Sequence, residues 1–278
     1  MKHVRLVATI VLIIFLAISC TSSAVKKERA QDTRNAALLE KSVESTDQNF
    51  VKGKTLLEEE KYEEALVAFE KSDYSQALFY RAMILQNKGH LDESEKLFKK
   101  CIENNTLKSE SYYNLGLIAF DRGNTPLSGE FMDKVLEISP EHIPSLYFKG
   151  NLYFIETDLD KALEYYNKAL KIDPRKTELW DAVFTVKLQK EEYGECWKIR
   201  DKIELSNPMI LANILKIGQK LEHYEETLAL IPENLENEPS IRQEKRIILT
   251  RIGKLKEAIE MANEDMSEKP ELDYAVID

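Results

Sequence analysis

Three prolines stand at a constant interval along this chain, because Pro140, Pro174 and Pro208 follow one another at steps of 34 residues. A fixed period of this length is typical of stacked repeat arrays, in which each unit is a short structural hairpin that packs against its neighbours. Such an array presents an extended surface rather than an enclosed pocket. We therefore expect a protein that holds other molecules.

The unit from Ile143 to Pro174 shows the repeated pattern most clearly. Gly150 is a small residue where two helices come close, and Ala162 is a small residue at the opening of the second helix. Tyr153 and Tyr166 are the large residues of the same pattern. This pattern resembles the tetratricopeptide repeat family, in which small residues let paired helices approach. The resemblance implies an all-α fold, a right-handed superhelical solenoid of antiparallel helix pairs.

The resemblance covers residues 46–270, in about six to seven units that are degenerate at both ends. The three central units are specific, whereas the first is about five residues short. In the fifth unit Lys187 and Arg200 stand where the family usually has aromatic residues. Residues 232–239 indicate a loop, and residues 271–278 form a C-terminal tail. Only 9 glycines and 8 prolines in 278 residues agree with a helical protein that has short turns.

The N-terminal sequence predicts that the protein is exported and anchored to a membrane. Lys2 and Arg5 precede an uncharged, largely apolar run from Leu6 to Ile18. This run is shorter than the ~20 residues that cross a bilayer, and it suits a signal peptide over residues 1–19. The residues that end at Cys20 (Ala-Ile-Ser-Cys) resemble a bacterial lipobox, which implies acylation of Cys20. The alternatives are an ordinary signal peptide with an incidental cysteine, or an uncleaved N-terminal anchor.

The residue after the cysteine bears on location. Thr21 is not the aspartate that resembles an inner-membrane retention signal, so the resemblance implies the periplasmic face of the outer membrane in a Gram-negative source. Residues 20–45 are expected to form a lipidated tether. Within it Arg34–Val43 has a weak apolar stripe typical of a short helix, and the sequence does not decide whether this helix docks on the first repeat.

Composition excludes several classes of function. The formal net charge is −10, which argues against binding to a nucleic-acid backbone because such binding requires basic surface. Cys101 and Cys196 lie three repeats apart, beyond disulfide reach, so we expect two buried free thiols. We find no metal-ligand, phosphate-binding or nucleophile motif. We therefore predict no enzyme activity, no cofactor, no metal and no nucleic-acid partner.

Aromatic residues recur in the first helix of successive units. In tetratricopeptide arrays the first helices line the concave side, which implies a groove for a protein or peptide partner. The candidate groove residues are Phe50, Phe79, Gln86, Tyr113, Asn114, Phe120, Tyr147, Asn151 and Phe154, and Asp181 ends the aromatic series. The alternative is that these aromatic residues pack against neighbouring helices.

Two functions follow from these features. The first is a membrane-anchored scaffold or adaptor in a bacterial cell envelope, held by lipid on Cys20, with a protein partner in the groove. The second is a lipoprotein that binds a small hydrophobic ligand in an aromatic-lined cavity, associated with a transporter. The second function needs a closed apolar cavity of a few hundred Å³.

Overall fold

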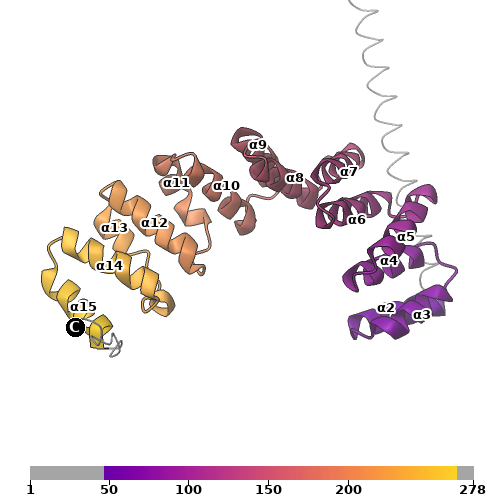
Figure 1. The fold of residues 1–278 in the computed structure, drawn as a ribbon, viewed down its shortest axis with the longest axis horizontal. Coiled ribbons are helices and arrows are strands. Elements are labelled where there is room, and N and C mark those ends of the chain that lie inside the picture. Colours follow the sequence, from indigo (N-terminus) through magenta and orange to yellow (C-terminus); the bar gives the residue numbers. More distant parts are fainter. Residues whose placement is uncertain (1–46, 268–278) are drawn as a thin grey trace, which may run out of the picture. The chain divides into compact units, whose positions relative to one another are not determined.

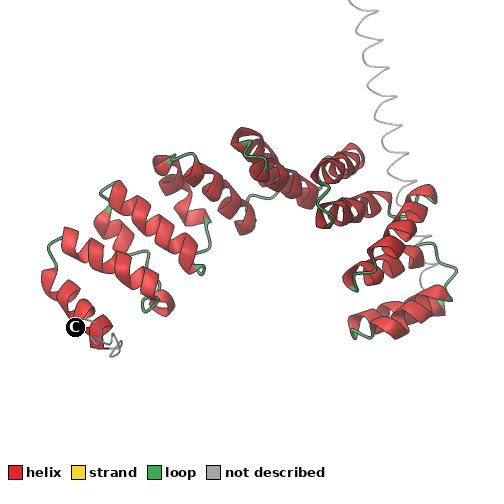
Figure 2. Ribbon diagram, in the orientation of Figure 1, coloured by secondary structure: helices red, strands yellow, loops and turns green. Residues whose placement is uncertain are grey.

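The computed structural model describes residues 47–267, and every regular element in this range is a helix (Figures 1 and 2). The helices pack in consecutive pairs, so the predicted all-α architecture of helix pairs is confirmed. The predicted signal peptide (1–19), the tether (20–45) with Cys20, and the tail (271–278) lie outside the described residues.

The chain divides into two compact units between Gly123 and Asn124. The described helices of the first unit are α2 (Gln48–Glu58), α3 (Tyr62–Glu70), α4 (Ala77–Asn87), α5 (Leu91–Glu103) and α6 (Lys108–Asp121). The second unit contains α7 (Thr125–Ile138), α8 (Ile143–Ile155), α9 (Leu159–Ile172), α10 (Thr177–Gln189), α11 (Tyr193–Ile199), η1 (Arg200–Lys202), α12 (Pro208–Lys220), α13 (Tyr224–Leu228), η2 (Glu233–Leu235), α14 (Pro239–Arg251) and α15 (Leu255–Ser267).

Local chemistry explains where the helices begin and end. Gly89 and Gly123 adopt positive φ angles of 82° and 75° in the turns that follow α4 and α6, a conformation that glycine reaches without steric cost. Asn124 then caps α7, because its side chain accepts a hydrogen bond from the backbone N–H of Leu127. Pro126 lies in the first turn of α7, where its missing N–H costs little.

Glycines at helix crossings set how closely the paired helices approach. A β-carbon on Gly150 of α8 would lie 2.3 Å from Cε1 of Tyr166 on α9, and one on Gly53 of α2 would lie 2.6 Å from Cε1 of Phe69 on α3. No side chain fits at either position without displacing a ring. The small residue at the close approach, which the sequence predicts at Gly150, is therefore confirmed.

We expect Gly150→Ala to lower the free energy of unfolding by about 2 kcal/mol, because the added methyl group overpacks the contact with Tyr166. Urea denaturation followed by circular dichroism measures the change. Gly194→Ala is the matched control, since no atom lies within 4 Å of a β-carbon there, and we expect it to stabilise α11 by up to about 1 kcal/mol. Equal midpoints for the two variants would contradict the packing argument.

The later part of the second unit departs from the repeat. α11 ends at Ile199 and continues as η1, and the Arg200 guanidinium lies 4.4 Å from the centre of the Trp197 ring. Trp197 also stacks on His223, with ring centres 5.1 Å apart. The polar Arg200, unusual for its position in the sequence repeat, thus packs on a neighbouring aromatic ring at the end of a shortened helix.

Cys101 and Cys196 are both buried and free, as predicted. Burial raises the pKa of each thiol to about 11, so both are protonated at neutral pH. No helix within residues 47–267 combines the length and apolar character that crossing a membrane requires. In the same range, no three His, Cys, Asp or Glu residues are grouped so that they could hold a metal ion.

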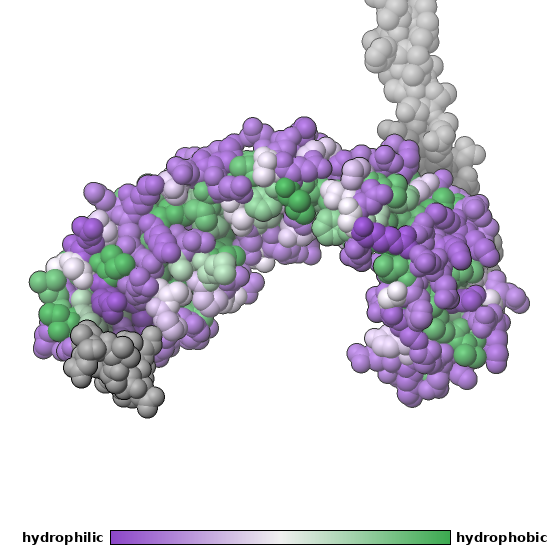
Figure 3. Space-filling view, in the orientation of Figure 1, coloured by the Kyte–Doolittle hydropathy of each residue, from purple (hydrophilic) through white to green (hydrophobic). Residues whose placement is uncertain are grey.

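The visible surface is largely hydrophilic (Figure 3), in keeping with a sequence in which 32% of residues are charged. Apolar side chains also gather on α15, where Leu255 and Ile259 are more than half exposed.

Candidate partner-binding cleft between α8 and α10

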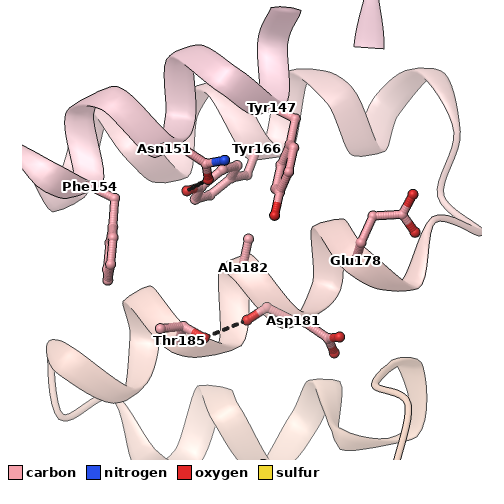
Figure 4. Close-up of a pocket in the computed structure, with 8 residues that line it drawn as sticks. All are labelled: Tyr147, Asn151, Phe154, Tyr166, Glu178, Asp181, Ala182 and Thr185. Carbon is pink, nitrogen blue, oxygen red and sulfur yellow. Dashed lines mark hydrogen bonds between the residues drawn. The ribbon is translucent and has the colours of Figure 1, made fainter. Parts of the chain in front are cut away.

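A cleft of about 290 Å³ lies within the second unit, between the first helices of two successive pairs (Figure 4). We call it the α8–α10 cleft. It is lined by Tyr147, Asn151 and Phe154 of α8, Tyr166 of α9, and Glu178, Asp181, Ala182 and Thr185 of α10. Three of the predicted groove residues are therefore brought together here.

The α8 wall follows from helical spacing. Tyr147, Asn151 and Phe154 are four and three residues apart, so they share one face of the helix. Figure 4 shows the two aromatic rings extending from α8 toward α10, with Asn151 between them. All three side chains are only partly buried. They form an accessible wall with an aromatic ring at each end and an amide in the middle.

Tyr166 of α9 forms the back of the cleft and holds Asn151. Its hydroxyl donates a hydrogen bond to Oδ1 of Asn151 at 2.7 Å, and its ring lies against Tyr147 with centres 5.7 Å apart. Burial raises the pKa of the Tyr166 hydroxyl, so it stays a donor at neutral pH. Because this bond uses the Asn151 oxygen, the amide N–H groups are the donors that remain. Within residues 47–267 they have no hydrogen-bond partner.

The α10 wall is small and acidic. Ala182 leaves room opposite Tyr147 and Phe154, and the Thr185 hydroxyl donates to the backbone carbonyl of Asp181 at 2.8 Å. Glu178 and Asp181 both lie in the first half of α10, and Figure 4 shows the Asp181 carboxylate extending to the side of the helix away from α8, so Glu178 supplies the carboxylate on the cleft side. An aromatic wall with a free amide donor thus faces a wall that carries negative charge.

Asp181 has an unusual environment for a carboxylate. Its Oδ1 atom is buried and has no hydrogen-bond partner. Burial raises the pKa of this side chain, the negative charges of Glu204 and Glu178 raise it further, and only the backbone N–H of Glu204 acts in the opposite direction. The ionised form of Asp181 is therefore destabilised in the folded chain.

We expect Asp181→Asn to raise the Tm at pH 7, by on the order of 2 °C, because asparagine fits the site without the charge. A raised pKa in the folded state means that ionised Asp181 costs stability above that pKa, and that this cost disappears as the pH falls below the ordinary value of 3.8. The advantage of the Asp181→Asn variant should therefore shrink between pH 7 and pH 4. Thermal unfolding at both pH values measures it, with the exposed Asp73→Asn as control. An advantage that grows at low pH would refute this explanation.

Two predicted groove residues lie elsewhere. Phe50 is fully buried and packs edge-on against Tyr74 and Tyr80, with ring centres 4.5 and 5.5 Å away. Phe79 is also buried, against Phe98 at 5.5 Å. The prediction that these two phenylalanines line a groove is wrong, because neighbouring aromatic side chains close over both rings and make them part of the core.

The other four predicted residues belong to the first unit. Gln86 lies on α4, and Tyr113, Asn114 and Phe120 lie on α6; all four are partly buried. The Asn114 amide donates to the carbonyl oxygen of Glu110 at 2.8 Å, and burial raises the pKa of the Tyr113 hydroxyl. These residues remain candidates for partner contacts of the first unit, separate from the α8–α10 cleft.

The sequence analysis did not predict that four of the residues lining the cleft would contact a partner. It places Tyr166 only in the space between helices, and it does not single out Glu178, Ala182 or Thr185. The repeat period could have found Thr185 because it follows Asn151 by 34 residues, just as Asp181 follows Tyr147. The second wall of the cleft is thus the first-helix face of the next unit.

Comparison with known proteins supports the repeat. Two sequence models described as "Tetratricopeptide repeat" match residues 79–143 and 143–176. The DnaJ protein P58IPK homolog B of Oryza sativa subsp. japonica is 24% identical over 76% of this chain and 39% of its own length. Protein O-mannosyl-transferase Tmtc3 of Drosophila melanogaster is 25% identical over 39% of this chain, but the match covers only 12% of that protein. The curated relatives are thus matched over only part of their length.

Solved structures show the same fold. A structure from the functional characterization of Pseudomonas aeruginosa pilF has a TM-score of 0.59 at 12% identity, covering 81% of this chain and 99% of that one. A tetratricopeptide repeat protein from Parabacteroides merdae has a TM-score of 0.52 at 18% identity, covering 70% of this chain and 79% of that one. The likenesses to solved structures agree with the fold of paired helices, and the matched models show that the chain carries tetratricopeptide repeats over residues 79–176.

Proposed function

We propose that this protein is a lipid-anchored scaffold of a bacterial cell envelope that binds an extended segment of a protein partner in the α8–α10 cleft. The observation that carries the proposal is the accessible row of Tyr147, Asn151 and Phe154 facing α10 across the cleft. Aromatic side chains provide large, rigid contact areas at protein interfaces. An amide with free N–H groups between them suits the backbone carbonyls of an extended chain.

The accessibility of the cleft favours a protein segment over a small hydrophobic ligand. Sites for small ligands bury about 70–90% of the ligand surface, whereas Tyr147, Asn151 and Phe154 all keep solvent contact. The opposite wall also carries Glu178 and Asp181, whose charges suit a polar partner better than an apolar ligand.

The anchor in this proposal rests on the sequence. Lys2 and Arg5, the uncharged run that follows them, and the lipobox-like residues ending at Cys20 support cleavage and acylation at Cys20. A lipid on Cys20 would hold the protein to a membrane leaflet, on the periplasmic face of the outer membrane in a Gram-negative source. The tether would give the helix pairs reach from that surface.

Chemical crosslinking in the native cells, followed by affinity capture, tests the cleft. We expect the Tyr147→Ala, Phe154→Ala variant to recover at least about tenfold less partner than wild type, because truncation of central aromatic contacts commonly costs more than 1 kcal/mol each. Ile155→Ala, Ile172→Ala is the matched control, since both isoleucines are exposed and outside the cleft. Equal recovery by wild type and the tyrosine–phenylalanine variant would reject the proposed site.

Metabolic labelling with a palmitate analogue tests the anchor. The label should disappear in Cys20→Ala, and the protein should leave the membrane fraction. Cys101→Ala and Cys196→Ala serve as controls that keep the label, because both thiols are buried. Labelling that persists without Cys20 would exclude acylation at this residue.

A further inference from the structure

We propose that the α8–α10 cleft selects a partner segment carrying a basic side chain, arginine or lysine, at the end of the cleft marked by Tyr147, Glu178 and Asp181. An apolar side chain of the same segment would occupy the other end, beside Phe154. This inference rests on the proposed function, and it adds the chemistry of the partner.

The two ends of the cleft differ in chemistry. Figure 4 shows Tyr147, Glu178 and Asp181 toward one end, and Phe154 and Thr185 toward the other. Both carboxylates are therefore at the Tyr147 end, whereas the Phe154 end is apolar apart from the Thr185 hydroxyl. A bound segment experiences negative charge at one position only.

The carboxylate of Asp181 lacks a positive partner. Glu178 has a lysine nearby, with Nζ of Lys176 3.5 Å from Oε1. Asp181 forms no ion pair with the described residues, and its buried Oδ1 has no hydrogen bond. The charges that act on it, those of Glu178 and Glu204, are negative. A cation supplied by a partner would neutralise a charge that the chain itself leaves uncompensated.

The geometry calls for a long side chain. In Figure 4 the Asp181 carboxylate extends to the side of α10 that is away from α8, while the Glu178 carboxylate extends toward α8. A segment lying against Tyr147 therefore reaches Asp181 only with an extended side chain. Arginine fits best, because its planar fork can donate to a carboxylate while its stem lies along an aromatic ring.

Tyr147 offers a second contact for the same cation. The chain already places cations over aromatic rings: Nζ of Lys149 lies 5.3 Å from the centre of the Tyr165 ring, and the Arg200 guanidinium lies 4.4 Å from that of Trp197. Within residues 47–267 no lysine or arginine lies over the Tyr147 ring, which borders the cleft. A cation bound beside this ring would lie near a π face and on the same side of α10 as the Glu178 carboxylate.

The spacing of the two ends sets the spacing of the partner residues. Tyr147 and Phe154 are seven residues apart on α8, which is about 10 Å along the helix axis. An extended or polyproline-type chain covers that distance in about three residues. The expected motif is therefore a basic and an apolar residue about three positions apart, in either order, with backbone carbonyls between them accepting from the Asn151 amide.

A random twelve-residue peptide library displayed on phage, selected against the purified full chain, tests the inference. We expect wild type to enrich arginine or lysine at least about threefold at one position, with an apolar residue about three positions away. Glu178→Gln, Asp181→Asn should lose the basic preference and keep the apolar one. Glu178→Lys, Asp181→Lys should enrich acidic residues instead. Glu257→Gln, Glu260→Gln on α15 removes the same charge outside the cleft and should behave as wild type.

The outcomes separate the inference from the proposed function. Peptides that depend on Tyr147 and Phe154 but show no basic preference would overturn the inference and leave the cleft as a peptide site. An unchanged basic preference in the Glu178→Gln, Asp181→Asn variant would also overturn it. Failure to select any peptide that depends on Tyr147 and Phe154 would reject both. Circular dichroism of each variant establishes that it is folded.

Discussion

Replacing Tyr166 with alanine is expected to lower the free energy of unfolding of the second unit by about 3–5 kcal/mol. Tyr166 is 2% exposed, its ring fills the space that Gly150 leaves open, and it lies against Tyr147. Removing the ring opens a cavity between α8 and α9 that the backbone cannot close without shifting a helix. Urea denaturation monitored by circular dichroism gives the change.

Tyr166→Phe is the matched control for this prediction. It keeps the ring but removes the hydroxyl that donates to Oδ1 of Asn151, so we expect a loss of about 1 kcal/mol, typical of one hydrogen bond. The phenylalanine variant also leaves the Asn151 amide free to rotate in the cleft. We therefore expect it to reduce the recovery of the partner more strongly than it lowers the free energy of unfolding. Equal losses of stability for the alanine and phenylalanine variants would show that the ring does not carry the packing.

Replacing Phe69 with alanine is expected to destabilise the first unit by a similar amount, about 3–5 kcal/mol. The Phe69 ring stacks on Tyr80 with centres 5.3 Å apart, lies 5.7 Å from Phe50, and covers Gly53 of α2. It therefore joins the first helix pair to α4. Removing the Phe69 ring therefore uncovers the other aromatic side chains of this buried cluster, and not a single side chain alone.

Amide hydrogen exchange followed by mass spectrometry measures this effect locally. Amides of α2, α3 and α4 should lose protection, whereas those of α12 and α14 should not, because repeat arrays transmit stability mainly between neighbours. Val67→Ala on the same helix is the control, since Val67 is more than half exposed. Uniform loss of protection across both units after Phe69→Ala would show that the array unfolds as one cooperative block.

Equivalent aromatic residues are buried in the first unit and accessible in the second, and this difference limits how much of the cleft could be predicted from the sequence. Phe50, Phe79 and Tyr147 hold equivalent positions in their first helices, and the sequence treats them alike. Tyr74 and Tyr80 close over Phe50, and Phe98 packs against Phe79, whereas Tyr147 faces Ala182, a side chain too small to fill the gap. Whether a ring becomes core or surface thus depends on the size of the side chains that neighbouring elements place against it.

The sequence by itself determined the repeat, the helix pairs and the places where helices touch, because these depend on local residues: a 34-residue period, Gly150 at the crossing, and turns at Gly89 and Gly123. Only the tertiary structure decided that Tyr147, Asn151 and Phe154 share a cleft with Tyr166 and Asp181. The physical reason is that a cleft is the space left between packed helices. Its shape and charge depend on side chains from α8, α9 and α10 together, and no single repeat specifies them.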